Sequence, residues 1–486
     1  MTTSATVEDD FDMLYAQPGR WLNDPRLLHH EGAYHLFHLQ GPRDWPKPPY
    51  EEMAHAVSDD LVSWQGSELL LKPGEPGNWD DRAIYTSGYI YHEGRYWTLY
   101  TGLKESEEGT IQRIGVAWSE DLVSWERHPD NPVLEPDRRW YVADPEEADY
   151  GHVGWRDPWI HHHSDGNFYA FFTALTKDGP AGRRGCIGLA KSPDMVQWDC
   201  LPPAYAPELE DQHEVPELFP YQGKWILMFG TKDNGLGMKY LVSDDPLRWD
   251  NDDPGKIILG GPGRMEYSMT TAPAAGDNER DAIHLVYEWR DDVEDNPRAR
   301  GRVALPKQLA GPPEDLRLQI RDDIRPREDD AEDPAVIFAG SSDHWELRDD
   351  TIIATPGSDI ARLIVPGEGP RAVSATITMS GLGEVGFCIG QDENLVTLTH
   401  RGQLIADTPA VDQRRGWEVA DTSGELTVAV VDKHADLYFN GRYMGTVCAI
   451  EKGDRVVQLY SAGEGSFLFK EIRVRPIEIA HSFPDT

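Results

Sequence analysis

The stretch EGAYHLFHL (31–39) places a glycine-containing turn before a strand of aromatic and apolar residues. The same pattern returns in three further stretches: EGRYWTLYT (93–101), DGNFYAFFT (165–173) and QGKWILMFG (222–230). A weaker fifth copy is RDAIHLVYE (280–288). Successive copies lie roughly 60 residues apart, and such even spacing indicates a repeated structural unit.

A second element follows four of these strands. It consists of a short strand, an acidic turn and a tryptophan, and it occurs as AVSDDLVSWQ (56–65), AWSEDLVSWE (117–126), AKSPDMVQWD (190–199) and LVSDDPLRWD (241–250). We expect each tryptophan to close the gap between neighbouring sheets. Five strand-rich units of similar length predict an all-β protein whose residues 10–310 form a five-bladed β-propeller.

The composition changes after the last repeat. Residues 311–334 are acidic and rich in proline, which predicts a linker. From 335 to 478 the chain shows alternating strand patterns such as LTVAVV (426–431), and FNGRY (439–443) is a hairpin signal. These features predict a C-terminal β-sandwich.

The charge balance is strongly acidic. The chain has 85 Asp and Glu against 46 Lys and Arg, a formal charge of −39, and only 13 of the basic residues are lysines. Such a surface repels phosphate backbones and anionic lipids, so we expect no nucleic-acid or membrane partner. A lysine-poor acidic surface is typical of proteins that stay soluble in high salt, which favours a halophilic protein. The N-terminus shows no leader pattern, which predicts a cytoplasmic protein unless a leader was removed.

Three turns carry a carboxylate one or two residues before a proline: WLNDPRLL (21–28), WRDPWI (155–160) and HEVPELF (213–219). Asp24, Asp157 and Glu214 lie eight or nine residues before the hairpin glycines of repeats one, three and four. In a propeller the first strand of each blade lies beside the central axis, so equivalent starts converge at one mouth of the channel. Turn formation alone predicts no such registry, so we expect the three carboxylates to meet in space.

Two carboxylates are the minimum requirement for cleaving a glycosidic bond. One protonates the leaving oxygen, and the other attacks the sugar or activates water. A crowded acidic site separates their pKa values, as the two roles require. A third carboxylate can bind sugar hydroxyls, and Arg156 would keep Asp157 ionised.

At these residues the chain resembles glycoside hydrolase family 32, the β-fructosidases, which include invertases, inulinases, levanases and fructosyltransferases. WLNDP resembles the family motif W-M-N-D-P-N-G, RDPW its R-D-P, and EVPELF its E-C-P. The resemblance covers the propeller, and the family's appended sandwich matches residues 335–478. The chain departs from the family at Arg26 and Leu27, which replace Asn-Gly, and at Val215, which replaces Cys.

The resemblance implies a retaining mechanism. Asp24 would be the nucleophile that forms a fructosyl-enzyme, and Glu214 would be the acid/base. Asp157, held by Arg156, would bind fructose hydroxyls, and Asn23 would orient the nucleophile or the sugar. Retention predicts that the Asp24 and Glu214 carboxyls lie about 5–5.5 Å apart.

Six further residues are candidate substrate contacts. Gln40 is one residue out of register with the family's strand glutamine, and Tyr85 and Ser87 lie where the family has F-S-G-S. For His55 and Trp79, the alternative to a sugar contact is packing in the core. For Glu217, the alternative is a place at the rim of the site or a role in supporting other residues. His161, His162 and His163 are adjacent on a strand and point to alternate faces, so they cannot all chelate one ion. We expect neither a metal nor another cofactor.

The favoured function is hydrolysis of terminal fructosyl residues from sucrose, fructo-oligosaccharides or fructans such as levan and inulin. Transfer to a sugar hydroxyl, which yields fructans or a difructose dianhydride, would use the same intermediate. An inverting arabinan- or xylan-cleaving hydrolase would instead hold its carboxyls roughly 6.5–9.5 Å apart. A sugar-binding propeller without activity is the non-enzymatic alternative. The sandwich would brace the propeller or help to form a homodimer.

The acidic surface makes a prediction about salt. The melting temperature and the activity are expected to rise as NaCl or KCl is added to molar levels, because counter-ions screen repulsion among the surface carboxylates. Circular dichroism melts and activity assays over a salt series measure this. Loss of structure on adding salt would contradict the halophile interpretation.

Overall fold

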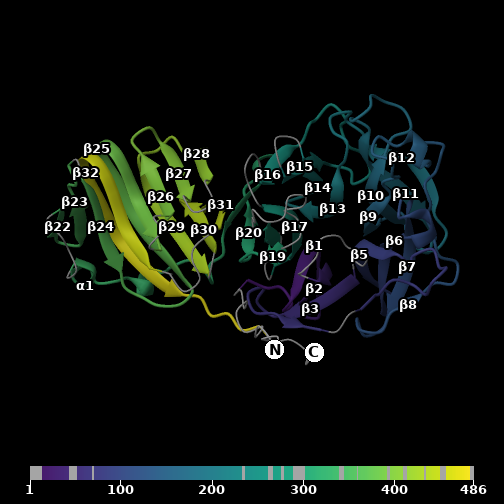
Figure 1. Cartoon of the computed structure of the whole chain (residues 1–486), viewed down its shortest axis with the longest axis horizontal. Helices are drawn as coiled ribbons and strands as arrows, with labels where there is room; N and C mark the ends of the chain where they lie inside the picture. Colours follow the sequence, from purple (N-terminus) through teal and green to yellow (C-terminus); the bar gives the residue numbers. More distant parts are fainter. Residues whose placement is uncertain are drawn as a thin grey trace, which may run out of the picture. The chain divides into compact units, whose positions relative to one another are not determined.

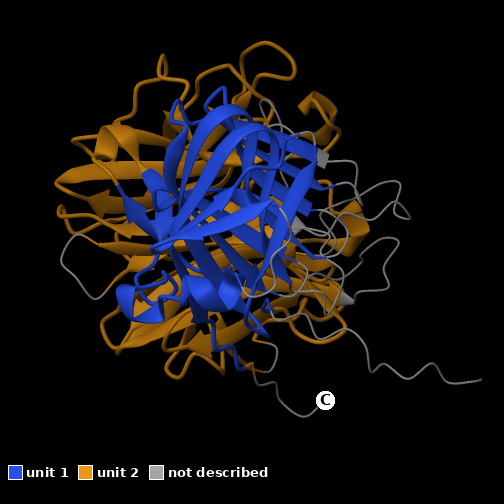
Figure 2. Cartoon of the chain, turned by 90° about the vertical axis from the view of Figure 1, so that its left-hand side faces the viewer, with its two compact units in different colours: residues 1–15, 305–310, 317–480 blue, residues 16–304, 311–316, 481–486 orange. Residues whose placement is uncertain are grey.

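The structure is a computed structural model of the whole chain. It describes residues 14–42, 52–67, 70–232, 236–260, 266–274, 279–287, 301–338, 344–357, 359–390, 394–408, 413–431, 434–448 and 456–481. The fold is almost entirely β and divides into two compact units (Figures 1 and 2). The propeller unit comprises residues 16–304, 311–316 and 481–486, and the sandwich unit comprises 1–15, 305–310 and 317–480.

The propeller unit contains five antiparallel blades, as the repeat predicts. The first strand of every blade is the innermost, and the chain continues outward from it. The blades are β1 (Arg20–His30), β2 (Ala33–Pro42), β3 (Glu52–Ser58) and β4 (Gln65–Gly66); β5 (Ala83–His92), β6 (Arg95–Leu103), β7 (Gln112–Ser119) and β8 (Glu126–Arg127); β9 (Arg156–His162), β10 (Phe168–Leu175), β11 (Gly185–Ser192) and β12 (Asp199–Tyr205); β13 (Glu214–Tyr221), β14 (Lys224–Thr231), β15 (Gly237–Ser243) and β16 (Lys256–Gly260); and β17 (Glu266–Pro273), β18 (Arg280–Tyr287) and β19 (Gly301–Val303). Two 3₁₀ turns, η1 (Glu105–Glu107) and η2 (Pro145–Glu147), lie in the connections.

The innermost strands form a closed ring. β1 contacts β5, β5 contacts β9, β9 contacts β13, and β17 closes the ring against β1. Hydrogen bonds join the remaining pair, since the Tyr267 hydroxyl of β17 donates to Glu214 of β13. The starts of the five strands therefore surround one axis (Figure 1).

Three of the four tryptophans of the second repeat element pack between blades, as the sequence predicts. Trp125 lies against a core that blades one and two share, and Trp198 against the core of blades two and three. Trp249 does the same between blades three and four. The preceding acidic turns are held by their own side chains: in the first, the Asp60 carboxylate accepts hydrogen bonds from the backbone N–H of Val62 and Ser63.

The sandwich unit is built on two long strands that pair with each other along their length. These strands are shared by two sheets, because each half of β25 (Arg371–Ile389) and β32 (Val457–Pro476) has different outer neighbours. Glycines mark the change of sheet: a Cβ on Gly381 or Gly463 would lie 2.4 Å from a backbone oxygen of the partner strand. The other strands are β22 (Trp345–Arg348), β23 (Thr351–Ala354), β24 (Ile360–Val365), β26 (Asn394–Thr399), β27 (Gln403–Thr408), β28 (Gln413–Glu418), β29 (Ser423–Val431), β30 (His434–Phe439) and β31 (Arg442–Cys448).

The segment 311–334 differs from the expected linker. It contains β21 (Arg317–Ile320), which pairs with β20 (Lys307–Ala310), and two 3₁₀ turns, η4 (Pro313–Asp315) and η5 (Glu328–Asp330). Its apolar residues Leu316, Leu318 and Ile324 are buried. The segment is acidic and rich in proline, as in the sequence prediction of a linker, and its apolar side chains pack in the protein. The short helix α1 (Pro334–Phe338) follows it.

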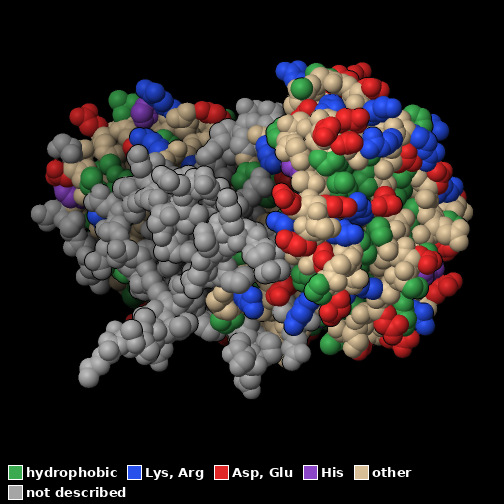
Figure 3. All heavy atoms as spheres, turned by 45° about the vertical axis from the view of Figure 1, so that its right-hand side comes forward, with side chains coloured by type: hydrophobic (Ala, Val, Ile, Leu, Met, Phe, Trp, Pro, Cys, Tyr) green, Lys and Arg blue, Asp and Glu red, His purple; other side chains and the backbone are tan. Residues whose placement is uncertain are grey.

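Acidic side chains are spread over the visible face of the propeller unit and are interspersed with basic ones, rather than gathered in one patch (Figure 3). None of the helices that the structure describes is long and apolar enough to span a bilayer.

The ring of inner strands makes a prediction about Gly88. A Cβ at this residue of β5 would lie 2.3 Å from the carbonyl oxygen of Pro158 and 3.0 Å from Cα of Trp159 in β9. Gly88→Ala is expected to destabilise the protein by about 1–3 kcal/mol, because the clash is with backbone that cannot move aside easily. Urea unfolding measures this, with Gly416→Ala as control, since its nearest neighbour is an oxygen at 3.9 Å. Equal stability of the two variants would contradict this close approach.

Candidate active site

Every innermost strand carries a β-bulge near its start. The pairing with the second strand shifts by one residue after Asn23, Tyr85, Arg156, Glu214 and Tyr267. In four blades the next residue has a positive φ: 44° at Asp24, 57° at Asp157, 46° at Val215 and 52° at Ser268. A bulge re-aims side chains that a regular strand would point into the sheet. The same backbone device therefore recurs around the axis.

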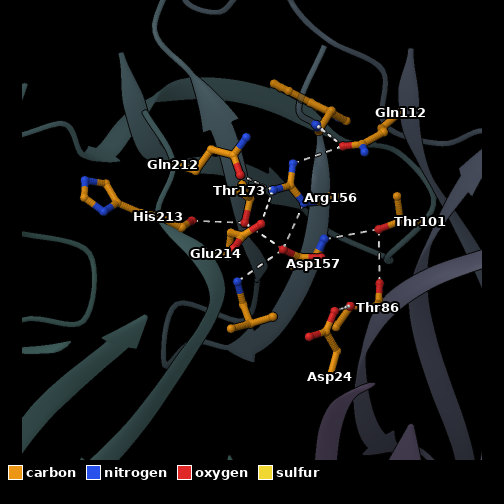
Figure 4. A network of polar contacts seen from close by, with 12 residues as sticks. Asp24, Thr86, Thr101, Gln112, Arg156, Asp157, Thr173, Gln212, His213 and Glu214 are labelled. Carbon is orange, nitrogen blue, oxygen red and sulfur yellow. Dashed lines mark hydrogen bonds and ion pairs between the residues drawn. The ribbon is translucent and has the colours of Figure 1, made fainter. Parts of the chain in front are cut away.

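The bulges refine the registry that the sequence predicts. Asp24 and Asp157 occupy the same bulge position, each before a proline. Glu214 lies one residue earlier, at the position of Asn23 and Arg156, and Val215 takes the place of the aspartates. The three carboxylates still converge, because the longer Glu side chain reaches from the neighbouring position (Figure 4).

Asp24 is held by hydroxyl groups from both neighbouring blades. Thr86 Oγ1, in the bulge of β5, donates to Asp24 Oδ2 over 2.5 Å. Ser268 Oγ, in the bulge of β17, donates to Oδ1 over 3.4 Å. Blades two and five thus place a neutral donor where blades one and three place an aspartate.

Asp157 and Glu214 share the guanidinium of Arg156 (Figure 4). Arg156 Nη2 lies 2.6 Å from Glu214 Oε1, and Nε lies 3.4 Å from Asp157 Oδ2. Asp157 Oδ2 also accepts hydrogen bonds from Thr173 Oγ1 (3.0 Å) and from the backbone N–H of Val215 (3.2 Å). These contacts fix Asp157 against both blades three and four.

Glu214 has two more partners. The Tyr267 hydroxyl donates to Oε2 over 2.8 Å, and Lys232 Nζ lies 3.7 Å from the same oxygen. Two glutamines orient the cations: Gln112 Oε1 accepts from Arg156 Nη1, and Gln212 Oε1 accepts from both Arg156 and Lys232. The network joins residues at the starts of inner strands to Thr173 near the end of β10, to Gln112 at the start of β7, and to Gln212 and Lys232 in loops beside β13 and β14.

The crowding of negative charge perturbs the acids. Burial and the charge of Asp157 raise the pKa of Asp24 to about 6 from its usual 3.8, and Glu214 adds to the rise. The hydrogen bond from Thr86 and the charge of Arg26 oppose it. Burial disfavours the charged form of Arg156, but Asp157 and Glu214 outweigh this effect and raise the pKa of its guanidinium. A carboxyl that titrates near neutral pH beside a fixed cation is typical of a catalytic centre.

This geometry agrees with a comparison of the sequence with known families. The family model "Glycosyl hydrolases family 32 N-terminal domain" matches residues 15–272, which include all three acids. The chain belongs to glycosyl hydrolase family 32.

Named relatives of this family-32 chain act on fructosides. Levanase of Bacillus subtilis (strain 168) is 27% identical over 340 residues, covering 63% of this chain and 46% of the levanase. Beta-fructofuranosidase insoluble isoenzyme 1 of Oryza sativa subsp. indica is 28% identical over 251 residues, covering 49% and 39%. The chain therefore matches less than half the length of these two relatives.

A solved structure of the family shares the fold. Fructan 1-exohydrolase IIa from Cichorium intybus superposes with a TM-score of 0.71 at 14% identity, covering 98% of each chain. This likeness shows the propeller and sandwich architecture that the family-32 resemblance implied.

Two predicted substrate contacts of the family-32 site lie elsewhere. His55 is buried in β3, the third strand of its blade, where it contacts His35 (3.1 Å) and Ser67 (3.2 Å); burial lowers its pKa to about 3. Glu217 has no exposed side-chain surface and accepts three hydrogen bonds from Thr270 and Thr271. Both satisfy their polar atoms inside the protein and are not available to a sugar.

The structure shows other surroundings for Gln40, Trp79 and Ser87. Gln40 pairs with Leu22, whereas Leu39 pairs with Asn23, so Gln40 points to the opposite face from Asn23. Trp79 packs over Gly102 and Gly115 in blade two, where each glycine leaves room for its ring.

The Ser87 hydroxyl lies against Met53 Sδ at 3.6 Å. Tyr85 and Asn23 share the register position of Arg156 and Glu214 and are half-buried, so their sugar contacts stay predictions.

Sequence reasoning missed several residues of the network: Thr86, Thr173, Lys232, Tyr267, Ser268, Gln112 and Gln212. Thr86 lies between the candidates Tyr85 and Ser87, and Ser268 follows the fifth repeat's start by two residues. Aligning the five repeat starts by their bulge would have found both, but no sequence signal marks Lys232. Among the residues that the structure describes, no group of three or more His, Cys, Asp or Glu is placed to hold a metal ion.

The raised pKa of Asp24 predicts a pH-dependent effect of Asp24→Asn on stability. Above pH 6 the carboxyl is charged in both the folded and unfolded states, so its burial cost is present in full; below about pH 4 it is neutral in both, and the cost disappears. The variant is therefore expected to gain up to about 3 kcal/mol over the parent at pH 8 and nothing near pH 4. Urea unfolding at a series of pH values measures this. A pH-independent difference would contradict the raised pKa.

Proposed function

We propose that this chain is a retaining β-fructofuranosidase that releases terminal fructosyl residues from sucrose, fructo-oligosaccharides or fructans. The observation that carries the proposal is that three acids interact at the starts of three inner strands: Asp157 and Glu214 share the guanidinium of Arg156, and the charges of both raise the pKa of Asp24. Family membership and the fructoside-acting relatives support the substrate class.

In this proposal Asp24 attacks the anomeric carbon and forms a fructosyl-enzyme. Its carboxylate is oriented on both sides, by Thr86 at Oδ2 and, over a longer contact, by Ser268 at Oδ1. Asp157, fixed by Arg156 and Thr173, accepts hydrogen bonds from fructose hydroxyls. Such bonds strengthen as positive charge develops on the ring in the transition state.

Glu214 protonates the leaving oxygen and later activates water. In the productive form Glu214 carries the proton that it delivers, and Asp24 is ionised. Arg156 and Lys232 lie beside the Glu214 carboxyl and hold it in place.

Product analysis tests the proposal. The protein is incubated in high salt with sucrose, inulin, levan and arabinan, and products are separated by chromatography with mass detection. We expect free fructose from one or more of the fructosides, and loss of at least about 10⁴-fold in kcat with Asp24→Ala, because no fructosyl-enzyme can form. Asp59→Asn, at an exposed position, is the matched control and keeps full activity.

The assignment of roles is tested by the leaving group. Glu214→Gln is expected to lose about 10²–10⁴-fold on sucrose but far less on a fructoside whose leaving group needs no proton. Asp24→Asn loses activity on both. Full activity of Asp24→Asn, or equal losses of Glu214→Gln on the two substrates, would contradict these roles.

Methanol as acceptor tests retention. A retaining enzyme gives methyl β-fructofuranoside by NMR, whereas an inverting one gives no methyl β-fructoside. Longer fructans or a difructose dianhydride would make the enzyme a transferase. Arabinose alone would indicate the inverting class, and no product from any substrate would support a sugar-binding propeller.

A further inference from the structure

Arg26 has no role in the proposed reaction, yet it lies two residues after Asp24 on the same inner strand. Its side chain is only 3% exposed. Nε donates to the carbonyl oxygen of Ser87 (3.3 Å), Nη1 to that of Val215 (3.4 Å) and Nη2 to that of Pro216 (3.2 Å). The guanidinium thus uses all three of its nitrogens on backbone of other blades.

These bonds place the guanidinium at the centre of the ring. β1 has β5 and β17 as neighbours, whereas Val215 and Pro216 belong to β13 of blade four. Bonds from blade one to blade four therefore cross the axis. The ring of Trp159, in blade three, lies 5.6 Å from the guanidinium carbon and contributes a cation–π contact.

Glu217 is the counter-charge of Arg26. Its Oε2 lies 3.9 Å from Arg26 Nη1, and its side chain has no exposed surface. Thr270 Oγ1 donates to Oε2 (2.8 Å), and the backbone N–H and Oγ1 of Thr271 donate to Oε1 (2.9 and 2.6 Å). Both charges take the same register position, the first regular pair after the bulge, in blades one and four.

We propose that Arg26 and Glu217 form a charge-setting pair on the propeller axis, in which Arg26 is a positioning residue that keeps Asp24 ionised and Glu217 limits the strength of its effect. The proposal rests on the proposed role of Asp24 as nucleophile. A buried cation stabilises a nearby carboxylate, and a counter-ion in contact with the cation weakens that effect. In agreement with this, the charge of Arg26 acts to lower the pKa of Asp24.

A purely structural role is the competing explanation. Three hydrogen bonds to two other blades would tie the ring together whatever the charge, and breaking a buried pair is destabilising in either case. Stability alone therefore does not distinguish the two. The direction in which the titration midpoint of Asp24 shifts distinguishes them. Removing the positive charge of Arg26 raises this midpoint, and removing the negative charge of Glu217 lowers it.

The experiment measures the titration of Asp24 in four backgrounds: the parent, Arg26→Gln, Arg26→Lys and Glu217→Gln. In each background, the effect of Asp24→Asn on the melting temperature grows with pH, and the pH above which it no longer grows gives the midpoint of Asp24 in the folded protein. The limb of kcat/KM that follows Asp24 is recorded on sucrose. Arg473→Gln, which breaks the ion pair with Glu425 in the sandwich unit, is the matched control for loss of a partly buried arginine.

We expect Arg26→Gln to raise the midpoint by about one pH unit and Glu217→Gln to lower it, while Arg26→Lys stays near the parent. Arg473→Gln leaves the midpoint unchanged. If Arg26→Gln does not fold, two results still distinguish the charge-setting role from a purely structural one: the downward shift of the midpoint in Glu217→Gln and the unchanged midpoint in Arg26→Lys.

Shifts of the same sign in Arg26→Gln and Glu217→Gln, or no shift in either, would overturn the proposal and leave a structural tie. This failure differs from failure of the proposed function, in which Asp24→Asn would keep full activity in the parent background whatever the midpoints are.

Discussion

Repulsion among three carboxylates that meet around one axis is the constraint on which the rest of this site depends. Asp24, Asp157 and Glu214 come from three blades, and the protein offsets their charge with cations placed between and beside them. Arg156 is held between two of the acids by glutamines that orient its nitrogens. Hydroxyl donors complete the compensation, because they stabilise a carboxylate without adding a second titrating group.

The fold supplies this arrangement by repeating one backbone feature. Each inner strand has a bulge at the same level, and the chain varies only the side chain that the bulge presents. Blades one and three present acids, while Thr86 and Ser268 of blades two and five hold one of them. A symmetrical scaffold thus yields an asymmetrical site, since the reaction needs unlike groups on the two sides of the sugar.

The acidic surface and the site obey different electrostatic rules. The whole chain has 85 acidic residues against 46 basic ones, and water and salt screen the charges that lie on its surface. Near the axis the charges are buried and screening is weak, so each acid requires hydrogen-bond donors or a cation in direct contact with it. The net charge of the chain therefore predicts its solution behaviour but says nothing about the balance at Asp24.

The sequence by itself determined the architecture and the acids. The spacing of the glycine-strand repeats predicts five blades, because blade length is a local property of turns and strand patterns. The NDP, RDP and EVP turns predict the converging carboxylates, because their place in the repeat fixes which strand they begin. The tertiary structure decided which neighbours of these residues face the axis.

The reason is that a bulge changes side-chain direction within one residue, and its position depends on pairing with the next strand. Thr86 rather than Ser87 meets Asp24, Val215 rather than Glu214 matches the aspartates, and Glu217 is sealed among threonines of another blade. Gln40 points to the opposite face from Asn23 because of strand alternation, whereas His55 is buried on the third strand of its blade. Such contacts join residues up to 244 positions apart in the chain, so no local pattern records them.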